Sequence, residues 1–115
     1  MNEQENFWKK SYSKEYMSKN KNFEYELGIR GWEKMLKYLI IKDQKPDSIL
    51  ECGSNIGRNI NFLNGLYPDS KKSIIEISKD AFNSVSKKYK LHKKSNSSIL
   101  QANFNERFDL VFTQG

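Results

Sequence analysis

Two acids and two glycines are the residues whose types and spacing suggest chemistry. The stretch ECGSNIG begins with Glu51 and places Gly53 and Gly57 shortly after it. Glycine weakens regular structure but adopts backbone conformations closed to other residues, so two glycines this close mark a tight turn or a close approach to a ligand. A second acid, Glu76, follows the apolar run SII. We therefore expect a binding site made of a glycine-containing loop and acids from two strands.

The order of these residues distinguishes two classes of ligand. A dinucleotide loop has the pattern G-x-G-x-x-G, but counting from Gly53 the next glycine positions are Asn55 and Arg58. The pattern that remains, E-x-G-x-N-x-G, offers a carboxylate to a cationic amino group and a short polar side chain to a carboxylate or the backbone. Glu76 lies about where nucleotide-binding α/β folds place an acid on the ribose hydroxyls. A ligand with an amino group, a carboxylate and a ribose is S-adenosylmethionine.

Strand patterns and helix patterns alternate around these residues. SILEC (48–52) is a short apolar run bounded by turn residues, and residues 58–67 have helical spacing that ends at YPDS. SIIEI (73–77) is rich in β-branched residues, and Ser78 is a plausible N-cap for the helix that follows it. KLHKKSN is a weak third strand and FDLVF (108–112) a strong fourth. The alternation predicts an α/β fold with a Rossmann-like parallel sheet and right-handed crossovers, preceded by N-terminal helices.

Two helical patterns come before the first strand. The first runs from Glu5 to Lys19, with aromatic residues at near-helical spacing among lysines. The second is stronger, because apolar residues from Ile29 to Ile40 recur at intervals of three and four. Pro46 cannot continue a helix. We therefore divide the chain into an N-terminal helical cap, residues 1–45, and a partial Rossmann-like domain that binds S-adenosylmethionine, residues 46–115.

Composition limits the class of protein. A hydrophobic content of 37% supports a modest core, and no apolar run is long enough for a signal peptide or a membrane span. The single cysteine, Cys52, is expected to be a small buried hydrophobe and fits a reducing cytoplasm. His92 has no visible partner and is given no catalytic role, and no metal site is expected. The prediction is a cytoplasmic protein with no membrane contact.

The net charge of +6 raises the alternative of nucleic-acid binding. The excess is mostly lysine, because only Arg30, Arg58 and Arg107 are arginines. Arginine is the better residue for bidentate contacts to bases, and a chain rich in lysine, asparagine and isoleucine is what an AT-rich coding sequence produces. A basic nucleic-acid-binding protein is therefore the lesser alternative.

The ordered motifs resemble a known family. ILECGSNIGRN, SIIEIS, NSSIL and RFDLVFTQG look like successive motifs of the class I S-adenosylmethionine-dependent methyltransferases. More narrowly, the N-terminal FW, EYMSKN and the E-x-G-x-N-x-G loop occur in matching order in the pseudaminic acid biosynthesis-associated methylases, and the similarity runs from Phe7 onward. The resemblance implies a methyltransferase of a sugar or nucleotide-sugar pathway, with S-adenosylmethionine as cofactor and a small-molecule acceptor.

The resemblance also implies which residues bind the cofactor. Those around its methionine part are Glu51, Gly53, Ser54, Asn55 and Gly57. Those beside the ribose, the adenine and the far side of the crevice are Glu76, Ile77, Ser98, Ile99, Thr113 and Gln114. Tyr16 and Asn20 would reach the site from the cap. No catalytic residue is assigned.

The resemblance implies that these four strands lie in the order 3-2-1-4 and that the sheet is incomplete, because the family continues with further strands and acceptor-binding residues after the fourth strand. Since Gly115 falls just after that strand, we expect a truncated methyltransferase, with no turnover by the 115 residues alone. The apolar fourth strand would then be an exposed edge that can pair with another chain. The main alternative is a catalytically inactive cofactor-binding or structural module.

Overall fold

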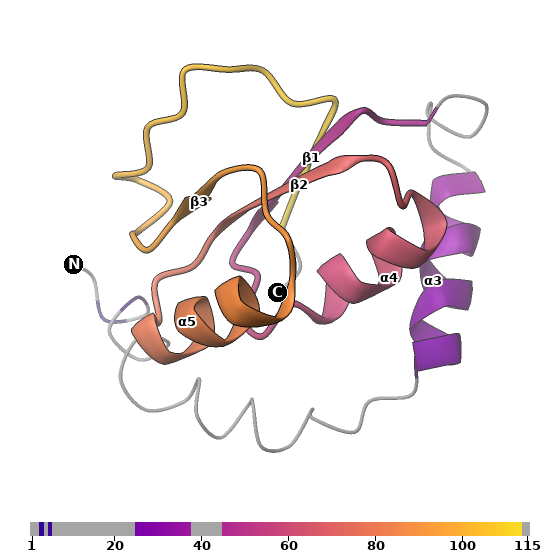
Figure 1. Ribbon diagram of the computed structural model, residues 1–115, viewed down its shortest axis with the longest axis horizontal. Helices are drawn as coiled ribbons and strands as arrows, with labels where there is room; N and C mark the ends of the chain where they lie inside the picture. The colour runs from indigo at the N-terminus through magenta and orange to yellow at the C-terminus, as the bar shows by residue number, and fades with distance from the viewer. Residues whose placement is uncertain (1–2, 4, 6–24, 38–44, 114–115) are drawn as a thin grey trace.

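The computed structural model describes residues 3, 5, 25–37 and 45–113. The elements in chain order are α3 (Tyr25–Lys37), β1 (Ser48–Cys52), α4 (Arg58–Leu66), β2 (Lys71–Ile75), α5 (Lys79–Lys88), β3 (Lys94–Ser95) and β4 (Leu110–Phe112) (Figure 1). The helix expected between Glu5 and Lys19 lies outside the described residues except for Glu5 itself, as does the end of the helix pattern that contains α3.

The four strands form one parallel sheet in the order β3-β2-β1-β4, which confirms the predicted Rossmann-like order. In the register of the sheet, Glu51 of β1 lies opposite Ile74 of β2 and Phe112 of β4. The carboxyl ends of β1 and β2 therefore meet at the same edge. This is where ligands bind in open α/β sheets.

Three strand boundaries differ from the predictions. β2 begins at Lys71 rather than Ser73 and ends at Ile75, so Glu76 follows the strand. The early start was missed because two lysines are not typical of a buried strand, yet Lys72 is 2% exposed and its Nζ donates to the Tyr67 carbonyl. β3 is reduced to Lys94–Ser95, and β4 is shorter than the predicted run 108–112.

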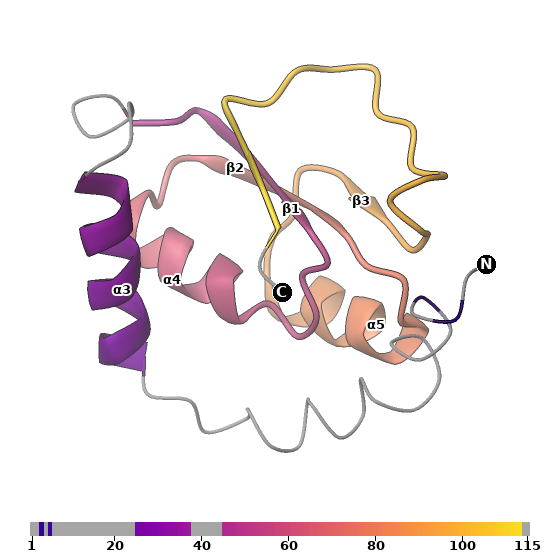
Figure 2. The ribbon, with the colours of Figure 1, turned by 180° about the vertical axis from the view of Figure 1, so that it is seen from behind.

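The two faces of the sheet are covered differently. Ile49 of β1 packs with Trp32 of α3 and with Phe62 and Leu63 of α4, whereas Leu50 and Cys52 belong to a separate cluster. That second cluster includes Ala102, Phe104 and Phe108 from the segment between β3 and β4. Figures 1 and 2 show α3, α4 and α5 on one side of the sheet and this segment crossing the other. Cys52 is buried, as predicted.

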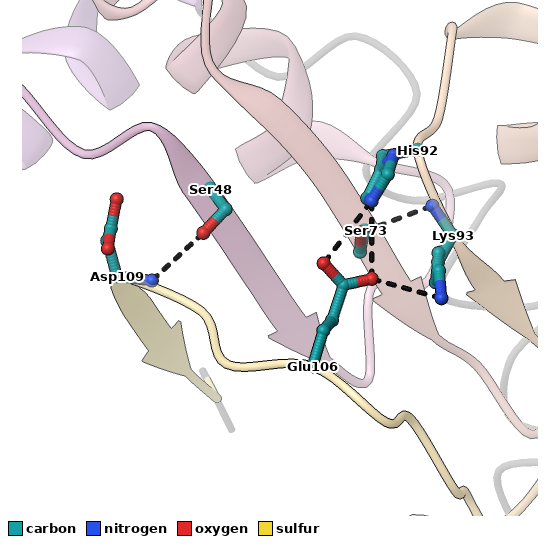
Figure 3. Close-up of polar contacts among 6 residues, drawn as sticks. All are labelled: Ser48, Ser73, His92, Lys93, Glu106 and Asp109. Atoms are coloured by element: carbon teal, nitrogen blue, oxygen red, sulfur yellow. Dashed lines mark hydrogen bonds and ion pairs between the residues drawn. The ribbon is translucent and has the colours of Figure 1, made fainter.

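The segment between β3 and β4 is fastened to the sheet by polar contacts (Figure 3). Glu106 Oε1 lies 3.2 Å from both His92 Nε2 and Lys93 Nζ, next to the start of β3. At the other end, the Asp109 backbone N–H donates to Ser48 Oγ at 3.0 Å. These contacts hold the segment against the face that carries Cys52, and they give His92 a partner, Glu106, that the sequence did not reveal.

A glycine sets how closely α3 packs on α4. A Cβ atom at Gly28 would lie 1.9 Å from Cζ of Phe62, so only glycine lets the two helices approach this far. The approach brings the indole of Trp32 over the first turn of α4, where it reaches Asn59. Nothing in the sequence around Gly28 indicates this constraint, because it comes from a residue on a different helix.

Candidate functional site

The site begins with the loop between β1 and α4, whose backbone turns through left-handed conformations. Gly53 has φ of 83°, Asn55 of 51° and Gly57 of 87°. Glycine adopts this region without a steric penalty, and asparagine is among the few other residues that do so readily. The loop is tied to β2 because the Gly53 N–H donates to the Ile75 carbonyl at 2.7 Å.

The two glycines of the loop have different neighbours. A Cβ atom at Gly53 would meet nothing within 4 Å, and the residue is exposed. A Cβ atom at Gly57 would lie 2.6 Å from Val85 Cγ2 and 2.8 Å from Tyr89 Cε2, both of which belong to α5 or its C-cap. The sequence suggests room for a ligand at both glycines. In the structure the open space is at Gly53, and Gly57 allows the start of α4 to pack against α5.

Glu51 is a buried acid in which one carboxyl oxygen accepts a hydrogen bond and the other does not. The residue is 1% exposed, and its Oε2 accepts a 2.8 Å hydrogen bond from Asn59 Nδ2. Oε1 is buried and accepts no hydrogen bond from any residue that the structure describes. A buried acceptor without a donor is costly, so this atom is suited to a group that brings a donor or a positive charge.

The surroundings of Glu51 determine its protonation. Burial, opposed by the hydrogen bond from Asn59, raises the pKa of Glu51 from 4.5 to about 8. The charge of Glu76 raises this pKa further, and that of Arg58 lowers it. Glu51 is therefore mostly protonated near neutral pH in the free protein, and a cation beside Oε1 would favour its ionised form.

Glu76 is also buried, with 5% of its surface exposed, but both of its carboxyl oxygens accept hydrogen bonds. Oε1 accepts from the Asn55 N–H and Oε2 from the Ser78 N–H, each at 2.7 Å. Burial raises the pKa of Glu76, and these backbone hydrogen bonds act in the opposite direction. Glu76 thus joins the β1–α4 loop to the start of α5. Ser78 is the N-cap predicted from the sequence, with Oγ accepting from the Ala81 N–H at 3.3 Å.

The two acids lie at the ends of neighbouring strands, and the charge of Glu76 contributes to the raised pKa of Glu51. The structure therefore brings Glu51, Gly53, Asn55 and Glu76 together at the ends of two neighbouring strands. Ser54 lies with them, 4% exposed, and its Oγ donates to the Asn55 carbonyl at 3.3 Å.

The other predicted site residues lie in the next loops or outside the described residues. Ile77 directly follows Glu76 and is half-buried. Ser98 is buried and accepts from the Leu100 N–H through Oγ, whereas Ile99 is 57% exposed. Thr113 is exposed after β4, and Gln114, Tyr16 and Asn20 lie outside the described residues.

Three residues of this region were not predicted to take part in the site. Asn96 Nδ2 donates to the carbonyls of Glu76 and Ile77, at 2.8 and 3.2 Å, and so holds the loop after β3 beside them. Asn59 bonds Glu51, and Trp32 Nε1 donates to Asn59 Oδ1 at 3.0 Å. Asn59 had a sequence signal, since it precedes Phe62, Leu63 and Leu66 at the spacing of one helix face and is the polar residue on that face.

Two further classes of site are not found in the described part of the chain. No group of three or more histidine, cysteine, aspartate or glutamate side chains there could hold a metal ion. Within the same residues, no helix has the length and apolar character needed to span a membrane.

The chain is similar to known proteins in its structure, but its sequence matches no known family. No protein-family model matches the chain, and no curated protein matches it. Solved structures do match. The plantazolicin methyltransferase BpumL in complex with a pentazolic desmethylPZN analog and SAH aligns with a TM-score of 0.70 and 16% identity, over 94% of this chain and 44% of that one.

Two other solved structures are similar. The sugar N-methyltransferase KedS8 from Streptoalloteichus sp. aligns with a TM-score of 0.67 and 12% identity, over 88% of this chain and 39% of that one. The N-methyltransferase NodS from Bradyrhizobium japonicum aligns with a TM-score of 0.53 and 22% identity, over 78% of this chain and 49% of that one. The chain thus spans less than half the length of each of these structures, and what it shares with them is the Rossmann-like fold of methyltransferases.

Proposed function

We propose that the chain binds S-adenosylmethionine at the carboxyl ends of β1 and β2 and forms the cofactor-binding part of a methyltransferase. The observation that carries the proposal is the buried Oε1 of Glu51, which has no hydrogen-bond partner among the described residues, together with the open space at Gly53 two residues further along the chain. A cationic amino group would supply the missing partner of that oxygen, and the open side of Gly53 leaves room for the chain that carries it. The structural similarity to methyltransferases solved with SAH supports the choice of ligand.

The remaining residues would hold the rest of the cofactor. Glu76 would take the ribose hydroxyls, since each of its oxygens has a lone pair left beside its backbone hydrogen bond. Ser54, Asn55 and Gly57 would complete the methionine side. The adenine and the far side of the crevice would be bordered by Ile77, Ser98, Ile99, Thr113 and Gln114, with Tyr16 and Asn20 in the cap.

The bound cofactor would supply a sulfonium methyl group, which passes to a nucleophile on the acceptor. The work of the protein is then to hold that methyl group in line with the acceptor and to exclude water. We propose a small-molecule acceptor, a sugar or nucleotide-sugar as in pseudaminic acid biosynthesis. The sugar N-methyltransferase KedS8 among the similar structures supports this class. A cytoplasmic location is proposed with it and is supported by the free Cys52.

We also propose that β4 pairs with a further strand, from the rest of a longer chain or from a partner. Among the described strands β4 has a neighbour on one side only, and its Val111 is 54% exposed. An edge strand of this kind can be extended by another strand. The similar structures, which are more than twice as long as the part that aligns, support a continuation of the sheet.

Calorimetry with S-adenosylmethionine and SAH tests the proposed function. We expect saturable binding by the chain and at least a tenfold weaker affinity in Glu51→Gln, which cannot carry a negative charge. Glu106→Gln is the matched control, because Glu106 is an acid on the surface between β3 and β4 and outside the site. Binding of neither ligand by the unmodified chain would overturn the proposal. Salt-dependent binding to DNA or RNA instead would favour the nucleic-acid alternative.

Methyl transfer is tested separately from binding. The chain is mixed with S-adenosylmethionine carrying a labelled methyl group and with a sugar-nucleotide acceptor, and label on the acceptor is measured. Binding without transfer, also when segments that extend β4 are added, would identify an inactive cofactor-binding module. Transfer would establish the methyltransferase.

A further inference from the structure

A chain of buried hydrogen bonds runs from helix α3 to the proposed ligand site. Trp32 Nε1 donates to Asn59 Oδ1 at 3.0 Å, and Asn59 Nδ2 donates to Glu51 Oε2 at 2.8 Å. The three residues come from α3, α4 and β1, and they are 6%, 7% and 1% exposed. All three side chains are therefore shielded from water. In such an interior a hydrogen bond is stronger than in water, and the loss of a hydrogen-bond partner costs more.

The direction of each hydrogen bond in this chain follows from the chemistry of the groups. An indole N–H can only donate, so it must face the carbonyl oxygen of the Asn59 amide. The amide nitrogen of Asn59 is then turned toward Glu51 and can only donate to it. Oε2 of Glu51 is thereby committed as an acceptor, and Oε1 is left for a proton or for a ligand.

The position of Trp32 is itself fixed from a second side. Its ring packs edge-on against Phe112 of β4, with centroids 4.9 Å apart and an interplanar angle of 77°. Phe112 lies opposite Glu51 in the register of the sheet. Trp32 thus contacts two elements next to Glu51, and its indole has little freedom to turn away from Asn59.

We propose that Trp32 and Asn59 are positioning residues, which hold the Glu51 carboxyl so that Oε1 faces the cationic amino group of the ligand. The inference rests on the proposed function and adds α3 to the site, although no residue of α3 was predicted there. In the free protein the same chain directs the Glu51 proton to Oε1. A cationic amino group that binds there displaces this proton, which leaves the site for solvent.

The test uses two ligands that differ in the amino-acid part. SAH carries the amino group, whereas 5′-methylthioadenosine has the adenosine and sulfur but no amino acid. We expect Asn59→Leu to weaken SAH at least tenfold and Trp32→Phe, which keeps a ring against Phe112, to weaken it threefold to tenfold. Both variants should bind 5′-methylthioadenosine within twofold of the unmodified chain. Asn64→Leu, on the same helix as Asn59, is the matched control and should change neither affinity.

The outcomes separate this inference from the proposed function. If the unmodified chain binds neither ligand, both fall. If it binds SAH but Asn59→Leu and Trp32→Phe leave its affinity unchanged, or weaken both ligands equally, the positioning inference alone is overturned. If Trp32 and Asn59 had a merely structural role, their variants would weaken both ligands equally. Trp32→Phe can distinguish the two roles even if Asn59→Leu fails to fold.

An NMR titration tests the hydrogen-bond chain without any ligand. In a Trp8→Phe background the one remaining indole N–H belongs to Trp32, and we expect its resonance to shift as Glu51 ionises between pH 6 and pH 10. The titratable or charged groups near Glu51 are Arg58, Glu76 and the Cys52 thiol. Adding Glu51→Gln should abolish the shift if it comes from Glu51 itself. A resonance that does not respond to pH, or that responds equally in the Glu51→Gln protein, would overturn the inference.

Discussion

Glu51 lies near the end of β1 and Glu76 directly follows β2. Both are almost fully buried, but the hydrogen bonds that they accept differ. Glu76 accepts one backbone N–H on each oxygen and so connects two loops. Glu51 accepts one side-chain hydrogen bond and keeps a buried oxygen without a partner. The ends of β1 and β2 therefore contribute unequally, because Glu76 connects two loops, whereas one oxygen of Glu51 has no hydrogen-bond partner among the described residues.

The two glycines of the β1–α4 loop divide in the same way. Both have left-handed backbones, yet Gly57 is packed under Val85 and Tyr89 and Gly53 faces open space. Glu76 and Gly57 thus make contacts that support the fold, whereas Glu51 keeps an oxygen without a hydrogen bond and Gly53 borders open space. Variants at the four positions can therefore separate the stability of the scaffold from the affinity of the site.

The largest effect on stability is expected from Gly57→Ala. The new methyl would lie 2.6 Å from Val85 Cγ2 and would force an alanine into a left-handed conformation, for a loss of about 4 kcal/mol in the free energy of unfolding. Gly53→Ala meets no atom within 4 Å, so only the backbone strain of about 1–2 kcal/mol applies. Denaturant unfolding of both variants checks this. Equal losses would contradict the difference between the two glycines.

How far the sequence predicts this division can be judged from particular residues. Local patterns predict the bounds of β1, the start of α4 and the Ser78 cap, because hydrophobic period and turn chemistry point the same way, and the order of the sheet follows from the resemblance. The loop was recognised for the same reason, since two glycines and an acid at short spacing are visible without a fold.

The partners of these residues were not predictable, because they come from elements distant in the chain. Phe62 makes Gly28 necessary, Val85 makes Gly57 necessary, and Trp32 reaches Glu51 only through Asn59. A pattern along one helix shows which face is buried but not which residue of another helix meets it. The sequence therefore predicts the elements of the sheet and the β1–α4 loop better than the contacts between distant elements.

The second prediction compares the two acids by the same substitution. Glu76→Gln places an amide NH₂ against one of two backbone donors, so we expect a loss of about 2–3 kcal/mol in the free energy of unfolding. Glu51→Gln should instead raise it at pH 7, by up to about 3 kcal/mol, because the unfolded glutamate is ionised there and takes up a proton on folding, whereas Gln is neutral in both states and can still accept from Asn59. Chemical unfolding at pH 7 measures both. A greater loss for Glu51→Gln would invert the comparison.

The third prediction concerns proton release on ligand binding. Since the pKa of Glu51 is about 8 in the free protein and a cationic amino group favours the ionised form, binding of SAH at pH 7 should release about one proton. Affinity should rise by up to about tenfold from pH 6 to pH 7. Calorimetry in buffers of different ionisation enthalpy measures the protons released. Glu51→Gln should release none, and release that persists in this variant would point to Glu76 instead.

The smallest effect is the dependence of stability on alkaline pH. The pKa of Glu51 is raised in the folded state, from 4.5 to about 8, so the folded protein binds its proton more tightly than the unfolded chain. Stability therefore falls as pH rises from 4.5 and stops falling above 8, with about 1 kcal/mol of that loss between pH 7 and pH 9. Cys52 and Lys72 also have shifted pKa values, so the measured quantity is the difference between the unmodified chain and Glu51→Gln. Unfolding free energies that change in parallel across this interval would show that Glu51 ionises as easily as an exposed acid, and the distinction from Glu76 would then lie in geometry alone.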